Sequence, residues 1–233
     1  LEISGLFQHT LPEGSHIQFI LWADPGIESF LKRWKKVRET QHPIFQKLAE
    51  RRVAHLQKMG IEGDPHLPSL TIRNIRCIVA FSRPGVLDNP VEEQKLLQVR
   101  DHVHTALKTL GMPVERWDAT DLLNTLDGMI NGGTGAPSLK WNPYDSLNQQ
   151  IPLSGQSTQI TKEGLVLNEG EAVIRTYSVR REPDQWSLHA MGDLIGDPFR
   201  DLLQIPCPFL IHYGIHISDQ EKTKLRVQSR ESW

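Results

Sequence analysis

The chain has 233 residues, with 26 lysines and arginines against 28 aspartates and glutamates, and 38% of its residues are hydrophobic. This composition is typical of a globular protein with a buried core, and the near balance of charge excludes a polycation or an acidic tail. No apolar run approaches the roughly 20 residues that a membrane-spanning helix requires.

The first third of the chain predicts a strand followed by two helices. The turn residues Leu11 to Gly14 precede a strand over residues 15–22, and Asp24 then favours the start of a helix as its N-cap. A second helix is predicted from Ile44 to Gly60. The apolar side chains expected to face inward on the two helices are Ile27, Phe30, Leu31, Trp34, Val37, Phe45, Leu48, Leu56 and Met59.

Basic residues concentrate on these two helices. Between Lys32 and Lys58 there are nine basic residues and two acidic ones, and nine minus two leaves a local balance of plus seven. Such a surface could face lipid headgroups or nucleic acid, or it could be the solvated side of two surface helices. The residues that we select for contact with an anionic surface are Lys32, Arg33, Lys35, Lys36, Arg38, Arg51 and Arg52.

The middle of the chain predicts an α/β (α+β) fold. Residues 70–82 become apolar on both faces, which is typical of a central strand, and a helix from Pro90 to Gly111 follows. A short strand over residues 114–117 then leads to a helix capped by Asp118 or Thr120. This order favours a mixed sheet partly covered by helices, and ferredoxin-like pairing is one arrangement that fits it.

The last part of the chain predicts smaller elements. The stretch NGGTGAP indicates a mobile loop within residues 131–140, and short antiparallel strands are expected over 157–160, 164–167 and 172–181. Two short helices are expected between Asp184 and Leu203. A strand over residues 209–217 should then place the odd-numbered side chains on one face, and the even-numbered ones, including His212 and His216, on the other.

The two cysteines, Cys77 and Cys207, fall in predicted strand or strand-entry positions. We expect both to be small buried side chains rather than a disulfide or a metal pair, because such thiols behave as small apolar groups. A chain without disulfides is typical of the cytoplasm.

No sequence motif indicates a catalytic, cofactor-binding or metal-binding residue. The phosphate-binding pattern G-x-x-x-x-G-K-S/T is absent, and the NGGTGAP loop lacks its lysine. His212 and His216 would lie roughly 13 Å apart on one strand, too far to bind a single zinc ion. Asp193 and Asp197 could form a carboxylate pair, but helix capping explains Asp197 without catalysis.

Several segments, taken in chain order, point to a known family. They are LPEGSHIQF (11–19), LAERR (48–52), IVAFS (78–82), WNPYD (141–145), QI (150–151) and LIGDPFRDLLQIPCPFLI (194–211). In this order they resemble the N-terminal region of TraC-type conjugative ATPases, the large cytoplasmic ATPases of type IV secretion and plasmid transfer.

The resemblance implies that residues 1–233 form a single N-terminal domain of a longer protein, with no nucleotide site and no cofactor of its own. ATP and Mg would belong to a C-terminal RecA-like domain. The resemblance further implies a non-catalytic docking and assembly domain, cytoplasmic and peripheral at the inner membrane. Its partners would be inner-membrane components of the secretion apparatus, its own ATPase domain and further copies in a hexamer. The residues expected at the join to the motor are Asp197, Pro198, Phe199, Pro206 and Pro208.

Two other functions remain open from the sequence. One is a small stand-alone enzyme built from polar residues near Asp193, Asp197, His212 and His216. The other is a nucleic-acid-binding module that uses the basic helices.

Overall fold

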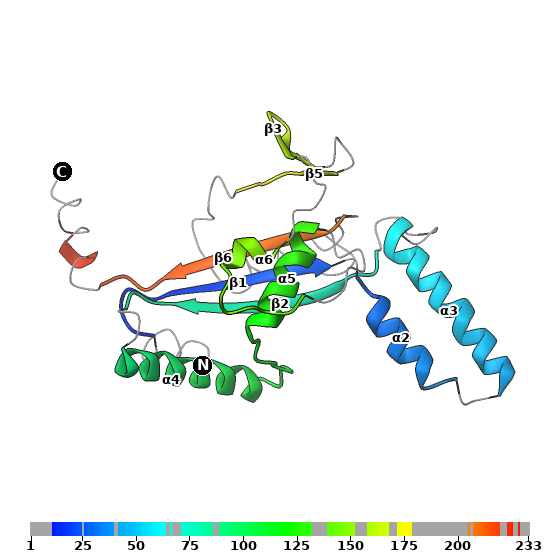
Figure 1. Cartoon of the computed structure of the whole chain (residues 1–233), viewed down its shortest axis with the longest axis horizontal. Helices are drawn as coiled ribbons and strands as arrows, with labels where there is room; N and C mark the ends of the chain where they lie inside the picture. The colour runs from blue at the N-terminus through cyan, green and yellow to red at the C-terminus, as the bar shows by residue number, and fades with distance from the viewer. Residues whose placement is uncertain are drawn as a thin grey trace. The chain divides into compact units, whose positions relative to one another are not determined.

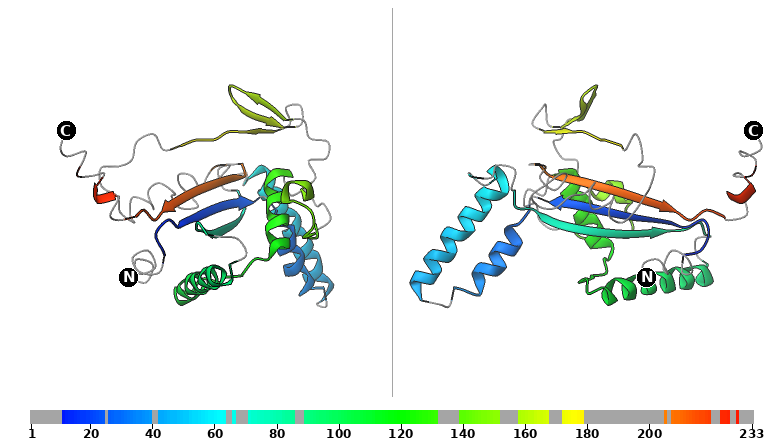
Figure 2. Two further views of the ribbon diagram at one scale, coloured as in Figure 1. Left: turned by 60° about the vertical axis from the view of Figure 1, so that its left-hand side comes forward. Right: turned by 180° about the vertical axis from the view of Figure 1, so that it is seen from behind.

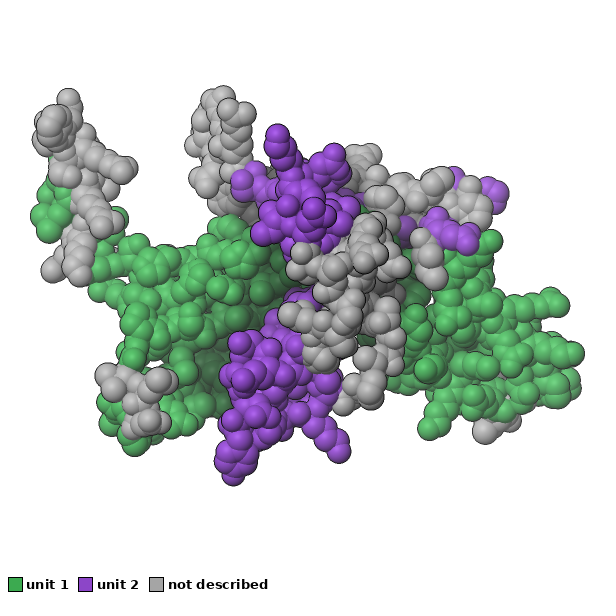
Figure 3. Space-filling view, turned by 45° about the horizontal axis from the view of Figure 1, so that its top comes forward, with its two compact units in different colours: residues 1–61, 72–116, 207–233 green, residues 62–71, 117–206 purple. Residues whose placement is uncertain are grey.

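The computed structural model describes residues 11–24, 26–39, 42–63, 66, 71–85, 89–131, 139–151, 158–167, 172–178, 205, 207–219, 223–225 and 228. The chain separates into two compact units, shown in green and purple in Figure 3. Unit 1 comprises residues 1–61, 72–116 and 207–233, and unit 2 comprises residues 62–71 and 117–206. That residues 1–233 act as a single domain stays a prediction.

Three antiparallel strands form the sheet of unit 1 (Figure 1). Strand β1 (His16–Asp24) lies in the centre, between β2 (Asn74–Ser82) and β6 (Phe209–His216). The prediction that residues 70–82 form a central strand was wrong. Among the described strands, β2 pairs with β1 alone, and its side chains alternate between half-buried and exposed positions. The apolar residues on both faces of β2 are therefore not all buried, and they do not indicate a central position in the sheet.

The register of the sheet places the core on one face. Ile17 lies opposite Phe81 on β2 and opposite Ile215 on β6, and it is completely buried. Helix α4 (Pro90–Thr109) contributes Val99 to the same core cluster. The cluster comprises the buried Leu11, Ile17 and Val99 and the partly buried Phe19, Val79, Phe81, Val103, Ala106, Ile215 and Ile217. One face of the sheet thus packs against α4.

The expectation of a fold that mixes helices and strands is confirmed, but its pairing is antiparallel throughout the described strands. In a ferredoxin-like fold neighbouring strands also pair antiparallel, but the two strands that a helix connects run parallel, with another strand between them. Here β1 and β2 run antiparallel although two helices connect them. Since β1 ends where β2 begins, the connecting helices leave and rejoin the sheet at the same end.

Asn89 caps α4, and Pro90 occupies the first turn. The Asn89 side chain accepts a hydrogen bond from the Val91 backbone nitrogen at 3.0 Å. Replacing Asn89 by alanine should lower the free energy of unfolding of unit 1 by about 1 kcal/mol, because this N–H loses its acceptor. Urea unfolding followed by circular dichroism measures the change. The exposed Gln94→Ala is the matched control and should leave stability unchanged; equal losses in both variants would contradict the role of the cap.

The prediction that the two cysteines are buried was wrong, because Cys77 and Cys207 are both exposed, although both are free thiols as expected. Cys77 lies on β2, next along the same face to Ile75, which is itself 49% exposed. The sheet nevertheless desolvates the Cys77 thiol in part, which raises its pKa and favours the protonated form.

Unit 2 contains α5 (Ala119–Asn131), the short α6 (Leu147–Gln150) and a small antiparallel sheet. The sheet orders β3 (Thr158–Thr161), β4 (Gly164–Leu167) and β5 (Ala172–Ile174), so the predicted antiparallel pairing is confirmed. The third strand was predicted over 172–181 but ends at Ile174, and residues 175–178 adopt no regular structure. The expected strand over 114–117 was wrong, since that segment adopts no regular structure. The helices expected at 184–203 and residues 132–138 of the expected loop lie outside the described residues.

A basic helical hairpin as the candidate interaction site

Helices α2 (Glu28–Lys36) and α3 (Pro43–Glu62) lie side by side as a hairpin between β1 and β2 (Figures 1 and 2). Small residues of α3, Ala49 and Gly60, let the two helices approach. Leu31 and Ala49 are buried, and a Cβ added at Gly60 would lie 3.2 Å from the Ile27 side chain. The second helix was predicted to end at Gly60, but it continues for two more residues to Glu62. Gly63 then ends it with a positive φ.

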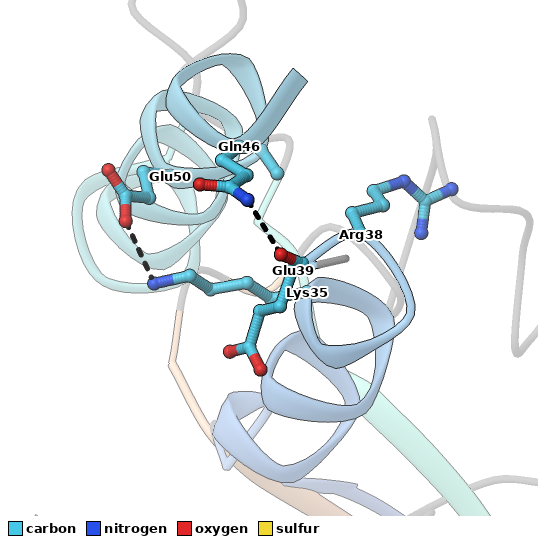
Figure 4. Close-up of a pocket in the computed structure, with 6 residues that line it drawn as sticks. Lys35, Arg38, Glu39, Gln46 and Glu50 are labelled. Carbon is cyan, nitrogen blue, oxygen red and sulfur yellow. Dashed lines mark hydrogen bonds and ion pairs between the residues drawn. The ribbon is translucent and has the colours of Figure 1, made fainter. Parts of the chain in front are cut away.

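Polar contacts fasten the two helices near the tip of the hairpin (Figure 4). Lys35 Nζ lies 3.3 Å from Glu50 Oε1, and Gln46 Nε2 donates a hydrogen bond to the Glu39 carbonyl oxygen at 2.6 Å. These residues, with Arg38 and Ala49, line an open polar hollow. Lys35 thus joins the two helices through an exposed ion pair with Glu50, and its contact with an anionic partner stays a prediction.

Most of the other selected basic residues point to solvent. Lys32, Arg33, Lys36, Arg51 and Arg52 are exposed and form no ion pair with any residue that the structure describes. Lys47 on α3 is exposed in the same way, although it was not among the residues selected from the sequence. Together these six residues are the exposed cations of the hairpin.

Arg38 is held differently from the exposed cations. Its guanidinium group lies 3.8 Å from the centre of the Trp34 ring and donates a hydrogen bond to the Trp34 carbonyl oxygen at 2.7 Å. This contact fixes the side chain at the end of α2 and leaves its positive charge without a carboxylate partner among the described residues.

Five large apolar side chains of the hairpin are exposed, four of them against expectation. We expected Phe30, Val37, Phe45 and Leu48 to face inward, but each is at least half exposed. The reason is that, among the residues that the structure describes, α2 and α3 lie mainly against each other, so only a narrow stripe of each helix is buried. The exposed fractions are 51% for Phe30, 69% for Val37, 61% for Ile44, 55% for Phe45 and 55% for Leu48.

The other residues selected from the sequence do not converge on a site. Pro208 is exposed and directly precedes β6, whereas Asp197, Pro198, Phe199 and Pro206 lie outside the described residues, as does Asp193. The expected split of residues 209–217 between two faces is confirmed by the register.

His212 and His216 share a face of β6 with Gly214 between them, and the His216 ring centre lies 6.5 Å from that of His16 on β1. The described ranges contain no group of three histidine, cysteine, aspartate or glutamate residues placed to hold a metal ion. None of the described helices combines the length and apolar character that crossing a bilayer requires.

Comparison with known proteins identifies the chain at the level of the family. A family model described as TraC protein matches residues 1–233, the whole chain. The chain belongs to the TraC family. Among curated proteins, Protein TraC of Escherichia coli (strain K12) is 22% identical over 163 residues, which cover 66% of this chain and 19% of that protein. No solved structure matches the chain.

Membership of the TraC family indicates a role in conjugative transfer and type IV secretion. The chain matches only about a fifth of the length of its curated relative. The hairpin includes the LAERR segment that contributed to the resemblance, and in the structure this segment supplies Arg51 and Arg52 to the exposed cations and Ala49 to the helix contact.

Proposed function

We propose that residues 1–233 are a non-catalytic docking and assembly domain of a conjugative transfer ATPase. The domain would attach the motor to the inner-membrane components of the secretion apparatus and would take part in forming a hexamer. ATP and Mg would be bound by an ATPase domain elsewhere in the full-length protein. The observation that carries the proposal is the family match over the whole chain, combined with its small share of the curated relative.

The geometry of the hairpin supports docking rather than catalysis. The hollow at its tip is open, and two of its charged residues, Lys35 and Glu50, pair with each other, whereas catalytic sites enclose a pocket with perturbed titratable groups. Its exposed cations and exposed apolar side chains instead form a surface that a large partner could cover.

Nucleotide chemistry tests the non-catalytic part of the proposal. The full-length protein should hydrolyse ATP, while residues 1–233 alone should neither bind nor hydrolyse it. Equilibrium binding of a fluorescent ATP analogue and release of phosphate measure both properties on the two purified proteins. Turnover of ATP by residues 1–233 would overturn the proposal in favour of an enzyme with a site of its own.

Competition in donor cells tests the docking part. Residues 1–233 produced beside the full-length protein should occupy its partners without bringing a motor, so conjugation frequency should fall several-fold. The matched control is the same chain carrying Ile17→Asp, which places a charge in the core of unit 1 and should not fold. Unchanged conjugation at equal protein levels would argue against docking by this region.

A further inference from the structure

We propose that the α2–α3 hairpin binds the surface of an anionic lipid bilayer. Its exposed cations would contact the headgroups, and the apolar side chains at its tip would enter the headgroup region. The proposal deepens the docking function proposed above and rests on it for the membrane location. The lipid contact itself follows from the charged and apolar side chains that the hairpin exposes.

The charge of the hairpin favours an anionic partner. A local balance of plus seven between Lys32 and Lys58 stands in a chain whose formal net charge is −2. The structure assigns one of the two acidic residues, Glu50, to an ion pair with Lys35. Six exposed cations remain without a described acidic partner, and each basic residue near an anionic leaflet adds to the attraction.

The apolar side chains separate a lipid surface from other anionic partners. Ile44, Leu48 and Arg51 follow one another at spacings of four and three residues, so they share one face of α3. The buried Ala49 marks the opposite, inward side of this part of the helix. A helix face that carries aliphatic side chains between basic ones is typical of helices that lie in a membrane interface.

Nucleic acid fits this surface less well. Proteins that bind single strands stack bases on exposed aromatic rings, and phosphate contacts alone need no apolar neighbours. Three of the five exposed apolar side chains, Val37, Ile44 and Leu48, are aliphatic and offer no ring. Of the two exposed aromatic rings, that of Phe30 lies 5.8 Å from the Arg33 guanidinium group, and that of Phe45 is 55% exposed.

The experiment is flotation of purified residues 1–233 with lipid vesicles. The protein should float with vesicles that contain phosphatidylglycerol and phosphatidylcholine, and it should stay at the bottom with phosphatidylcholine alone. Raising the salt concentration should reduce binding, because salt screens the contacts of exposed charges. Absence of binding to the phosphatidylglycerol vesicles would overturn the proposal.

Two double variants separate the contribution of the apolar side chains to vesicle binding from that of the charges. Ile44→Ser with Leu48→Ser should lower binding several-fold while leaving its salt dependence unchanged, because all charges remain. Arg51→Gln with Arg52→Gln should lower binding and also weaken its dependence on salt. Circular dichroism checks that each variant keeps its helices.

Matched controls lie outside the hairpin. Ile160 on β3 is 88% exposed and Lys162 follows it, so Ile160→Ser with Lys162→Gln removes an exposed apolar and a basic side chain elsewhere. This variant should bind vesicles as the unchanged chain does. Loss of binding to the same extent as in the hairpin variants would overturn the assignment to the hairpin.

Binding to DNA in place of vesicles is the outcome that would favour a nucleic-acid partner. If residues 1–233 bind DNA in a salt-dependent way that Ile44→Ser with Leu48→Ser leaves intact, and do not bind vesicles, the lipid proposal is overturned. Failure of the docking function is distinguishable, because it appears as unchanged conjugation in the donor-cell competition. Vesicle binding by the purified chain does not depend on that result.

Discussion

Replacing Ile17 by alanine is expected to lower the free energy of unfolding of unit 1 by about 2–5 kcal/mol. Ile17 is completely buried on β1, the central strand of the sheet, where it belongs to one cluster with Leu11 and Val99. Because β1 is paired on both sides, the sheet cannot close easily over the cavity that the shorter side chain leaves. Urea unfolding gives the free energy, and hydrogen exchange of the β1 amides assigns the loss to unit 1.

The control for Ile17 is Ile75 on the neighbouring strand β2. Ile75 lies on the same face of the sheet but is 49% exposed. Ile75→Ala deletes the same atoms and should cost less than about 1 kcal/mol, since water already reaches the side chain. Equal losses for the two variants would contradict the placement of the core against α4.

Local features of this fold could be predicted from the sequence because neighbouring residues determine them. Gly14 supplies the positive φ of the predicted turn before β1. Asp118 accepts a hydrogen bond from the Asp121 backbone nitrogen at 2.9 Å, and the Asp121 carboxylate accepts one from the Asp118 nitrogen, so the predicted cap of α5 is confirmed. The strand over residues 164–167 has the predicted bounds.

Features that depend on distant parts of the chain could not be predicted in the same way. Periodicity identified the apolar side chains of α2 and α3, but it does not tell how many neighbours will cover them, and Phe30, Phe45 and Leu48 remain exposed. Likewise, the apolar run in β2 does not reveal that β1 takes the centre of the sheet.

The basic residues of the hairpin could likewise be predicted only in part from the sequence. The basic run was visible in the sequence, and most of its members are exposed as an anionic contact requires. The ion pair that occupies Lys35 was not visible, because Glu50 lies fifteen residues away on the other helix of the hairpin. Two of the three aliphatic side chains that distinguish lipid from nucleic acid, Val37 and Leu48, were expected to be buried, so their contribution to the surface emerged only from the structure.

Asp24 was expected to cap the first helix, and the structure gives it a different role. Helix α2 begins only at Glu28, with Ile27 in the cap position. The buried Asp24 ends β1, where its carboxylate accepts a hydrogen bond from the Gly26 nitrogen at 2.8 Å. The same carboxylate lies 2.5 Å from Arg76 Nη2, on the strand opposite.

Replacing Asp24 by alanine is therefore expected to lower the free energy of unfolding of unit 1 by about 1–3 kcal/mol. The change removes the acceptor for the Gly26 nitrogen and leaves the half-buried Arg76 guanidinium group without its carboxylate. That group would keep only its stacking on the Trp22 ring, whose centre lies 4.2 Å away. Urea unfolding, followed by circular dichroism and tryptophan fluorescence, measures the loss.

Asp24→Asn separates the two contributions, because an asparagine still offers an oxygen to the Gly26 nitrogen but carries no charge for Arg76. It should cost less than Asp24→Ala. A double-mutant cycle of Asp24→Asn with Arg76→Gln then isolates the ion pair, and we expect a coupling of about 1 kcal/mol. A coupling near zero would show that the Asp24 carboxylate stabilises the turn alone. The expected coupling would instead show that the ion pair between Asp24 and Arg76 joins β1 to β2 at the end of the sheet from which the hairpin leaves.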